Sequence, residues 1–350
     1  MTHTRETGAG SGVQVTPKKT ELVAPAGNLK ALKSAVDNGA DAVYAGFRDN
    51  SNARNFPGLN FSLDEIYKGV EYVRSHGKRL FLAVNTYPTP AAWDTSIRAV
   101  DRAAATGVDA LILADMGLMQ YAAEQYPDLR LHLSVQGSAT NRHAIGFFHQ
   151  HFGIKRVVLP RVLSLAQIQQ LVNRVPVEVE VFGYGSLCVM VEGRCSLSSY
   201  VTGDSPNSKG VCSPAQAVRW QETPEYRESY LNEVLIDRYT NNEKSSYPTI
   251  CKGRFRVNGQ VFHAIEEPVS LNLLEILPEL VNSGISAIKL EGRQRSHVYV
   301  ARITQILRAA LDACLADPDT YVADRRWMRA LSELSEGSCT TLGAYHRPWQ

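Results

Sequence analysis

From residue 20 onward the chain repeats one pattern: a short apolar run, a turn and an amphipathic stretch. Eight of the runs are apolar almost throughout, which is typical of parallel strands covered on both faces. They are Glu21–Ala26, Ala42–Phe47, Arg79–Asn85, Ala110–Asp115, Arg130–Gln136, Arg156–Arg161, Val177–Phe182 and Ala287–Glu291. The amphipathic stretches predict helices at residues 28–38, 62–76, 92–106, 117–126, 141–151, 164–174, 271–283 and 296–316.

Eight strand-then-helix units predict an α/β fold, a closed TIM-like (β/α)8 barrel, with an open doubly wound sheet as the alternative. Successive strands start 20 to 37 residues apart, except that 110 residues separate the starts at 177 and 287. We therefore expect a cysteine-rich insertion, over about residues 183–268, between strand 7 and its helix. Because barrel chemistry lies at the C-terminal ends of the strands, the insertion leaves the barrel at its functional end.

The remaining sequence adds few features to this domain. Residues 1–20 are rich in Thr, Gly and Ser and lack the apolar core of a signal peptide, so we expect a flexible leader. Residues 21–350 then form one barrel domain that ends in a helical tail. No uncharged apolar run approaches the roughly 18 residues that span a bilayer, so no transmembrane segment is expected. We expect a cytoplasmic protein whose cysteines stay reduced.

The charge balance narrows the classes of partner. The 37 basic and 35 acidic residues give a net charge of +2, which argues against a dedicated nucleic-acid binder.

Four of the six cysteines fall in the expected insertion, with the spacing C-x6-C-x16-C-x38-C. They are Cys188, Cys195, Cys212 and Cys251. Four thiolates can hold a structural zinc ion or give one ligand to each iron of a 4Fe–4S cluster, and the wide spacing leaves both open. Cys314 lies among apolar residues of the last helix and is expected in the core, whereas Cys339 lies in a Gly/Ser/Thr tail.

The sequence EVFGYGSLCVMVEGRCSLS (residues 180–198) resembles the signature of the collagenase-like peptidase family, whose catalytic type is unknown. The segments PAGNLKAL (25–32), NGADAVYAG (38–46) and KLEGRQRS (289–296) also resemble this family. Five more segments resemble its members that act in ubiquinone biosynthesis. They are NARNFPGLNF (52–61), ALILADMGLM (110–119), RVVLPRVLS (156–164), NEVLIDRY (232–239) and TTLGAYHRPWQ (340–350).

This resemblance implies an oxygen-independent hydroxylase of the aromatic ring in ubiquinone biosynthesis, working as a heterodimer with a UbiV-like chain. It implies a 4Fe–4S cluster whose ligands are Cys188, Cys195, Cys212 and Cys251. A UbiT-like lipid-binding accessory is expected to present the polyprenyl-phenol precursor. Prephenate is expected as the hydroxyl donor, because family members that hydroxylate tRNA and rRNA use it.

Two other activities and a scaffold role compete with this interpretation. A cysteine-type peptidase needs a base positioned beside a nucleophilic thiol, and the sequence shows no such pairing. Prephenate-dependent RNA hydroxylation needs a broad basic face, which the balanced charge does not favour. A scaffold without catalysis would tolerate mutations at the barrel mouth.

A dicarboxylate donor implies cationic side chains at the barrel mouth. We therefore select Arg54, Arg161 and Arg293, which follow predicted strands, although each is as well explained as a surface or salt-bridged arginine. Four other polar residues end strands at the same mouth, with strand capping as the alternative role: Asn85, Asp115, Gln136 and Glu291. His132 alternates with leucines inside its strand and is expected to be a core histidine.

Overall fold

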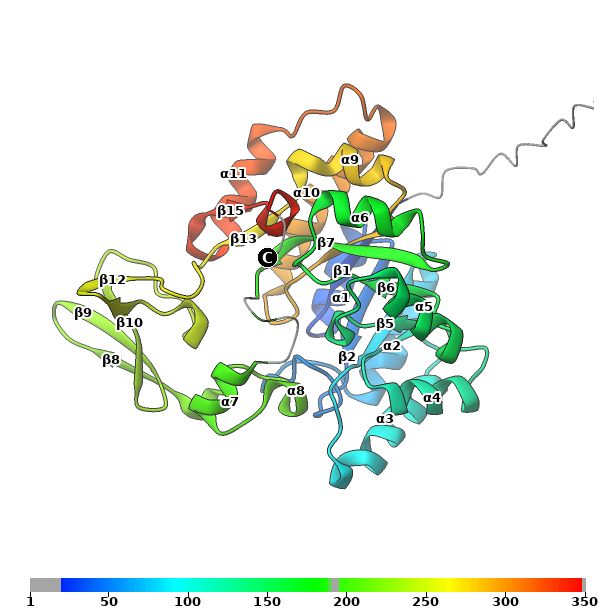
Figure 1. The fold of residues 1–350 in the computed structure, drawn as a ribbon, viewed down its shortest axis with the longest axis horizontal. Helices are drawn as coiled ribbons and strands as arrows, with labels where there is room; N and C mark the ends of the chain where they lie inside the picture. Colours follow the sequence, from blue (N-terminus) through cyan, green and yellow to red (C-terminus); the bar gives the residue numbers. More distant parts are fainter. Residues whose placement is uncertain (1–19, 189, 191–194, 348–350) are drawn as a thin grey trace, which may run out of the picture.

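A computed structural model describes residues 20–188, 190 and 195–347 of the chain. At its centre lies a ring of eight parallel strands (Figure 1). They are β1 (Glu21–Pro25), β2 (Ala42–Gly46), β3 (Arg79–Val84), β4 (Ala110–Leu113), β5 (Leu131–Leu133), β6 (Arg156–Val158), β7 (Glu178–Ser186) and β14 (Ala287–Leu290). β14 pairs with both β1 and β7, so the sheet closes. The predicted TIM-like barrel is confirmed, and the open sheet is wrong.

Helices cover the outside of the barrel. They are α1 (Leu29–Asp37), α2 (Leu63–Ser75), α3 (Trp93–Ala105), α4 (Met116–Gln125), α5 (Arg142–Phe152), α6 (Leu165–Val172), α9 (Leu277–Asn282) and α10 (His297–Ala316). Local sequence explains where several begin. At α2 the Ser62 hydroxyl accepts the backbone N–H of Glu65, and the Glu65 carboxylate accepts the N–H of Ser62. This capping box satisfies two backbone donors and fixes the start of the helix where the sequence predicts it.

Strand β7 is longer than the apolar pattern predicts. The prediction ended at Phe182, whereas β7 continues to Ser186 because its second half pairs antiparallel with β13 (Ser270–Asn272). For the same reason the helix predicted over 271–283 is shorter, since its first residues belong to β13 and only α9 is helical after a 3-10 turn. The insertion therefore starts after Ser186.

The C-terminal residues return to this long strand. Helix α11 (Arg325–Leu334) follows α10, and the Tyr184 hydroxyl donates to the carbonyl of Leu331 at 2.6 Å. The Tyr345 hydroxyl donates to the carbonyl of Phe182 at 2.5 Å. A two-residue strand, β15 (Thr340–Thr341), pairs with β13. The C-terminal segment thus supports the strand from which the insertion leaves.

Residues 187–269 form the insertion. Its elements are α7 (Ser196–Thr202), α8 (Pro206–Lys209), β8 (Val218–Glu222), β9 (Tyr226–Leu231), β10 (Val234–Thr240), β11 (Phe255–Val257) and β12 (Gln260–Phe262). β8, β9 and β10 make an antiparallel sheet, and β11 and β12 make a hairpin. Figure 1 shows these strands standing beside the barrel, with α7 and α8 nearer to its β2 side.

The inside of the barrel is unusual for this architecture. Bulky branched side chains fill most TIM barrels. Here the apolar cluster inside the ring includes four alanines, Ala42, Ala83, Ala110 and Ala287. These small side chains leave room for charged ones, which are described below.

The first residue of the domain lies one position earlier than the sequence suggests. Thr20 is buried, and its hydroxyl donates to the carbonyl of Ile285 at 3.1 Å. Residues 1–19 of the predicted leader lie outside the described residues. Within the described part, none of the helices is long and apolar enough to cross a membrane.

Candidate functional site

A cavity opens at the C-terminal ends of the barrel strands, where enzymes with this fold carry out their chemistry. It encloses about 570 Å³, including its open mouth. Among the described residues, its wall carries four basic side chains, which are Arg54, Arg161, Lys289 and Arg293, and one carboxylate, Glu291. Tyr44, Ile112 and Phe182 add apolar surface. This composition suits a small anionic ligand with a hydrocarbon part.

Six of the seven catalytic or substrate-binding candidates line this cavity: Arg54, Asn85, Gln136, Arg161, Glu291 and Arg293. Asn85 ties two walls together, because its side chain accepts the N–H of Ala53 at 3.0 Å and donates to the Ser134 hydroxyl at 2.9 Å. Arg161 donates to the carbonyl of Ser186 at 3.0 Å, and its guanidinium lies 4.2 Å from the Phe182 ring centre.

Arg293 is the most enclosed of these cations. It is 5% exposed, and its Nη1 has no hydrogen-bond partner within the described part of the chain. Burial lowers its pKa to about 10, so the group stays charged at neutral pH. A Cβ on Gly46 would lie 2.7 Å from this Nη1, so a glycine at the end of β2 makes space for the guanidinium. An unpartnered buried donor at a cavity wall indicates an anionic ligand.

Asp115 does not share the cavity, contrary to the sequence-based prediction. Strand β4 ends only two residues before Asp115, and α4 starts directly after it. Its carboxylate accepts the backbone N–H of Leu118 at 3.0 Å and caps α4. Asp115 therefore has a helix-capping role.

The sequence analysis missed Lys289 and Tyr44. The Lys289 Nζ donates to the Glu180 carboxylate at 2.7 Å and lies 3.8 Å from the Tyr44 ring centre. The Tyr44 hydroxyl donates to the carbonyl of Leu290 at 2.8 Å. The signal for Lys289 was available, because it is the one charged residue inside the otherwise apolar run AIKL of β14.

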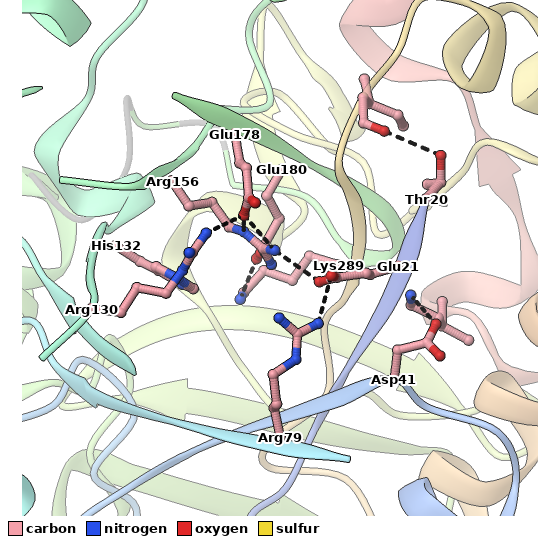
Figure 2. A network of polar contacts seen from close by, with 12 residues as sticks. Thr20, Glu21, Asp41, Arg79, Arg130, His132, Arg156, Glu178, Glu180 and Lys289 are labelled. Carbon is pink, nitrogen blue, oxygen red and sulfur yellow. Dashed lines mark hydrogen bonds and ion pairs between the residues drawn. The ribbon is translucent and has the colours of Figure 1, made fainter. Parts of the chain in front are cut away.

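A network of ion pairs surrounds the buried Arg156 (Figure 2). Arg156 is fully buried and pairs with Glu21 at 2.8 Å, Glu178 at 2.8 Å and Glu180 at 3.0 Å. Arg79 pairs with Glu21 at 2.5 Å, and Arg130 pairs with Glu178. The network fills the space that the alanines of the barrel interior leave.

His132 lies beside this network. Burial, reinforced by Arg156 and Arg130, holds its pKa well below the usual range, so the ring is neutral. Its Nε2 accepts a hydrogen bond from Arg130 at 3.0 Å, and its ring packs edge-on against Phe81. The expectation of a core histidine is confirmed by this burial.

The four cysteines of the insertion influence one another electrostatically. Burial raises the pKa of Cys251 to about 11, and Cys188 and Cys212 act in the same direction. Part of Cys212 is exposed to solvent, but the protein around its sulfur raises the pKa of the thiol. Cys188 and Cys195 raise this pKa further, whereas Arg54 lowers it. These contributions link Cys212 with Cys188 and Cys195, and Cys251 with Cys188 and Cys212.

Four cysteine thiols are a donor set that a zinc ion or a 4Fe–4S cluster can take. Within the described residues, no group of three or more His, Cys, Asp or Glu side chains is arranged to hold a metal ion. The Ser198 backbone N–H donates to the Cys195 sulfur at 3.4 Å, so that this side chain caps α7. Residues 189 and 191–194, between two cysteines, lie outside the described part.

The other two cysteines lie apart from this group. Cys314 is fully buried in α10, as the sequence predicts, and Cys339 is exposed near the C-terminus.

The cysteine region and the cavity share one stretch of chain. A Cβ on Gly210 would lie 2.5 Å from the carbonyl oxygen of Asn52, so the segment before Cys212 packs directly on the loop after β2. Arg54 belongs to that loop, lines the cavity and acts on the Cys212 thiol. On the other side, Lys252 pairs with Glu336, which accepts the Ser186 hydroxyl at 2.7 Å.

Comparison with known proteins identifies the class of this protein. The chain belongs to peptidase family U32, whose model matches residues 27–348. It is 30% identical over 331 residues to "tRNA hydroxylation protein P1" of Bacillus subtilis, covering 95% of this chain and 72% of that protein. It is 33% identical over 319 residues to "tRNA hydroxylation protein P" of Escherichia coli, covering 85% and 69%. Relatives in this family are thus named for hydroxylation.

Among solved structures, the chain resembles the U32 peptidase Mk0906, with a TM-score of 0.48 and 12% sequence identity. The match covers 83% of this chain and 97% of that one.

Proposed function

We propose that this chain is a UbiU-type subunit of an oxygen-independent hydroxylase that acts on the aromatic ring of a polyprenyl-phenol precursor in ubiquinone biosynthesis. It works in the cytoplasm as a heterodimer with a UbiV-like chain, and a UbiT-like protein presents the lipid. The observation that carries the proposal is the position of Arg54, which lines a cationic cavity and acts on Cys212, the thiol that interacts with the other three insertion cysteines. Hydroxylation in the relatives' names supports the same class of reaction.

The residues around the cavity fit a dicarboxylate donor such as prephenate. Arg293 offers its Nη1, which has no hydrogen-bond partner among the described residues, and Arg54 and Arg161 line the same cavity. Fork-shaped guanidinium groups bind carboxylates through paired, charge-assisted hydrogen bonds. Phe182 and Ile112 give the ring of the ligand an apolar surface.

The cysteines fit the cofactor that oxygen-independent chemistry requires. A 4Fe–4S cluster bound by Cys188, Cys195, Cys212 and Cys251 would supply one-electron transfer. Arg54 adds a positive charge next to Cys212, which favours the thiolate form that a metal ligand needs. The Ser198 N–H holds the Cys195 sulfur in place.

RNA hydroxylation is the second candidate, because the relatives at 30% and 33% identity are named for tRNA. The β8–β10 sheet carries paired arginine and tyrosine side chains that could bind RNA. The Arg219 guanidinium lies 3.9 Å from the Tyr230 ring centre, and the Arg238 guanidinium lies 4.4 Å from the Tyr226 ring centre. Against it stands the net charge of +2.

Peptidase activity is the least supported candidate. A cysteine nucleophile is activated by a lowered pKa. In this chain burial raises the pKa of both Cys212 and Cys251.

Metal analysis tests the cofactor first. Protein purified without oxygen should contain about four iron and four sulfide per chain, as one 4Fe–4S cluster requires. Cys212→Ala should lose the cluster, whereas the matched variant Cys314→Ala should keep its iron, because Cys314 lies buried in α10. Zinc in place of iron, or full iron content in Cys212→Ala, would contradict the ligand assignment.

Substrate assays then separate the two hydroxylation candidates. Under anaerobic conditions, with prephenate and the UbiV-like chain, we expect hydroxylation of the polyprenyl-phenol precursor and none of tRNA. Prephenate-dependent modification of tRNA without any quinone product would show instead that the chain hydroxylates RNA.

A further inference from the structure

Lys289 lies where the ion-pair network meets the cavity. It is 5% exposed, and its side chain lines the cavity floor while its Nζ donates to Glu180 at 2.7 Å. The ring of Tyr44 covers one side of the Nζ, with its centre 3.8 Å away. Lys289 therefore combines a place in the cavity wall with an ion pair to a buried carboxylate.

The charges in the network do not balance. Seven side chains are joined by ion pairs (Figure 2): Arg79, Arg130, Arg156, Lys289, Glu21, Glu178 and Glu180. They carry four positive and three negative charges when all are ionised. Arg79 and Arg130 are each 34% exposed, whereas the buried members are Arg156, Lys289 and Glu180, two positive groups and one negative. Uncompensated charge among these buried groups is costly. His132 is neutral and does not contribute.

Lys289 is the member of this set that can remove the excess. Arginine does not lose its proton in proteins, whereas lysine loses it readily when it is buried beside other cations. Burial lowers the pKa of Lys289 and its cationic neighbours Arg156 and Arg293 add to this, with Glu180 opposing. A neutral Lys289 leaves three positive and three negative charges in the network.

We propose that Lys289 is a nucleophile that forms a Schiff base with the carbonyl group of a small 2-oxo acid bound in the cavity. A lysine placed in a desolvated site beside other cations is activated for this chemistry. The inference rests on the proposed function in one respect, that this cavity is where the small-molecule donor binds.

A 2-oxo acid fits because it carries a carboxylate and a carbonyl side by side, and the same cavity wall offers a cation and an amine. The Nη1 of Arg293 has no hydrogen-bond partner among the described residues and is available to the carboxylate. Arg293 and Lys289 both approach the Tyr44 ring, with the guanidinium 5.7 Å and the Nζ 3.8 Å from its centre, and the charge of Arg293 acts on Lys289. In the proposed complex the carboxylate binds Arg293 and the neighbouring carbonyl meets Lys289.

The proposed step balances in atoms and charge. The neutral Lys289 amine attacks the carbonyl carbon to form a C–N bond. The C–O bond then breaks, and the oxygen leaves as water after receiving one proton from the attacking nitrogen and one from solvent. The product is a protonated imine, so one positive charge enters and one remains. No oxidant or reductant is consumed.

Borohydride trapping tests the inference directly. The full-length protein, purified without oxygen, is incubated with pyruvate or phenylpyruvate, reduced with sodium borohydride, digested and analysed by mass spectrometry. We expect one reduced adduct, on the peptide that contains Lys289. Absence of an adduct, or adducts spread over exposed lysines such as Lys68, would overturn the proposal.

Two variants and one control test whether labelling depends on Lys289 and Glu180. Lys289→Arg keeps the charge but removes the nucleophile and should lose labelling, whereas Lys68→Arg should label as the parent does. Glu180→Gln should slow labelling at least tenfold, because the ionised carboxylate that pairs with the protonated imine is gone. The parent experiment needs no variant, so it stands if Lys289→Arg fails to fold.

The readout also separates this inference from the proposed function. A normal cluster with no adduct refutes only the Schiff base. An adduct on Lys289 in protein without iron refutes the cluster assignment and leaves the Schiff base standing.

Discussion

Replacing Glu180 by Gln tests whether the charges inside the barrel stabilise the fold as a connected network. Glu180 is 1% exposed and pairs with Lys289 at 2.7 Å and with Arg156 at 3.0 Å. Glutamine has nearly the same shape, so packing is preserved and the change removes mainly the charge. Arg156 keeps two other carboxylates, but Lys289 loses its only ion-pair partner among the described residues.

The expected cost follows from burial. Removing one partner of a buried ion pair typically destabilises a protein by about 3–5 kcal/mol, because the remaining charge is uncompensated. We expect about 3 kcal/mol, the lower end of that range, since Lys289 can release its proton. The matched control is Glu222→Gln, whose parent carboxylate pairs with Arg227 at 2.7 Å but is 68% exposed. Exposed pairs contribute roughly 0.5 kcal/mol.

The difference between parent and variant should also depend on pH. Burial acts to raise the pKa of Glu180, but Lys289 and Arg156 outweigh it, so the folded-state pKa lies below the ordinary 4.5. A group with a depressed folded pKa stabilises the protein above its unfolded pKa, and the contribution is lost as the pH falls through the folded value. The deficit of Glu180→Gln should therefore be full at pH 7 and shrink below about pH 4.5.

Urea unfolding followed by circular dichroism measures both quantities for the two variants. Equal costs for Glu180→Gln and Glu222→Gln, or a deficit that stays constant into acid, would refute the argument that the buried charges act as a network.

Two further substitutions test the assignments at the cavity. Asp115→Ala should lower the free energy of unfolding in urea by about 1 kcal/mol, because α4 loses its cap. The affinity for pyruvate, measured by calorimetry, should stay unchanged. A loss of affinity would show that Asp115 contributes to ligand binding. Gly46→Ala places a Cβ 2.7 Å from the Arg293 Nη1 and should weaken pyruvate binding about tenfold, or about 1.4 kcal/mol. Gly146→Ala on α5 is the control, since a Cβ there meets no atom within 4 Å. Unchanged pyruvate affinity in both variants would show that Arg293 does not bind the ligand.

Hydrophobic patterning was sufficient to predict the barrel because its strands are covered on both faces. The strands in Ala42–Phe47 and Ala110–Asp115 read as continuous apolar runs, and all of their core residues are buried. The antiparallel extension of β7 was not predictable in this way. It depends on pairing with β13, in which Ser270 lies opposite Ser186, 84 residues earlier in the chain. The sequence of neither segment indicates which strand it pairs with.

The same reasoning explains which site residues could be predicted. Asn85 and Asp115 are both polar residues at strand ends, and the pattern treats them alike. They differ in the next segment of chain: α4 begins directly after Asp115, whereas several loop residues separate Asn85 from the next helical turn at Pro90–Ala92. Where a helix begins directly after the polar residue, its side chain caps the helix. Where a loop follows, the side chain can face the cavity.

Arg54 connects the cysteine region with the cavity. The segment before Cys212 can pack on the loop after β2 only because Gly210 has φ +79° and no side chain, since a Cβ there would meet the Asn52 carbonyl oxygen at 2.5 Å. Arg54 belongs to the same loop, lines the cavity and acts on the Cys212 thiol. Under the proposed function, an anion that binds Arg54 in the cavity would therefore change the electrostatic field at Cys212.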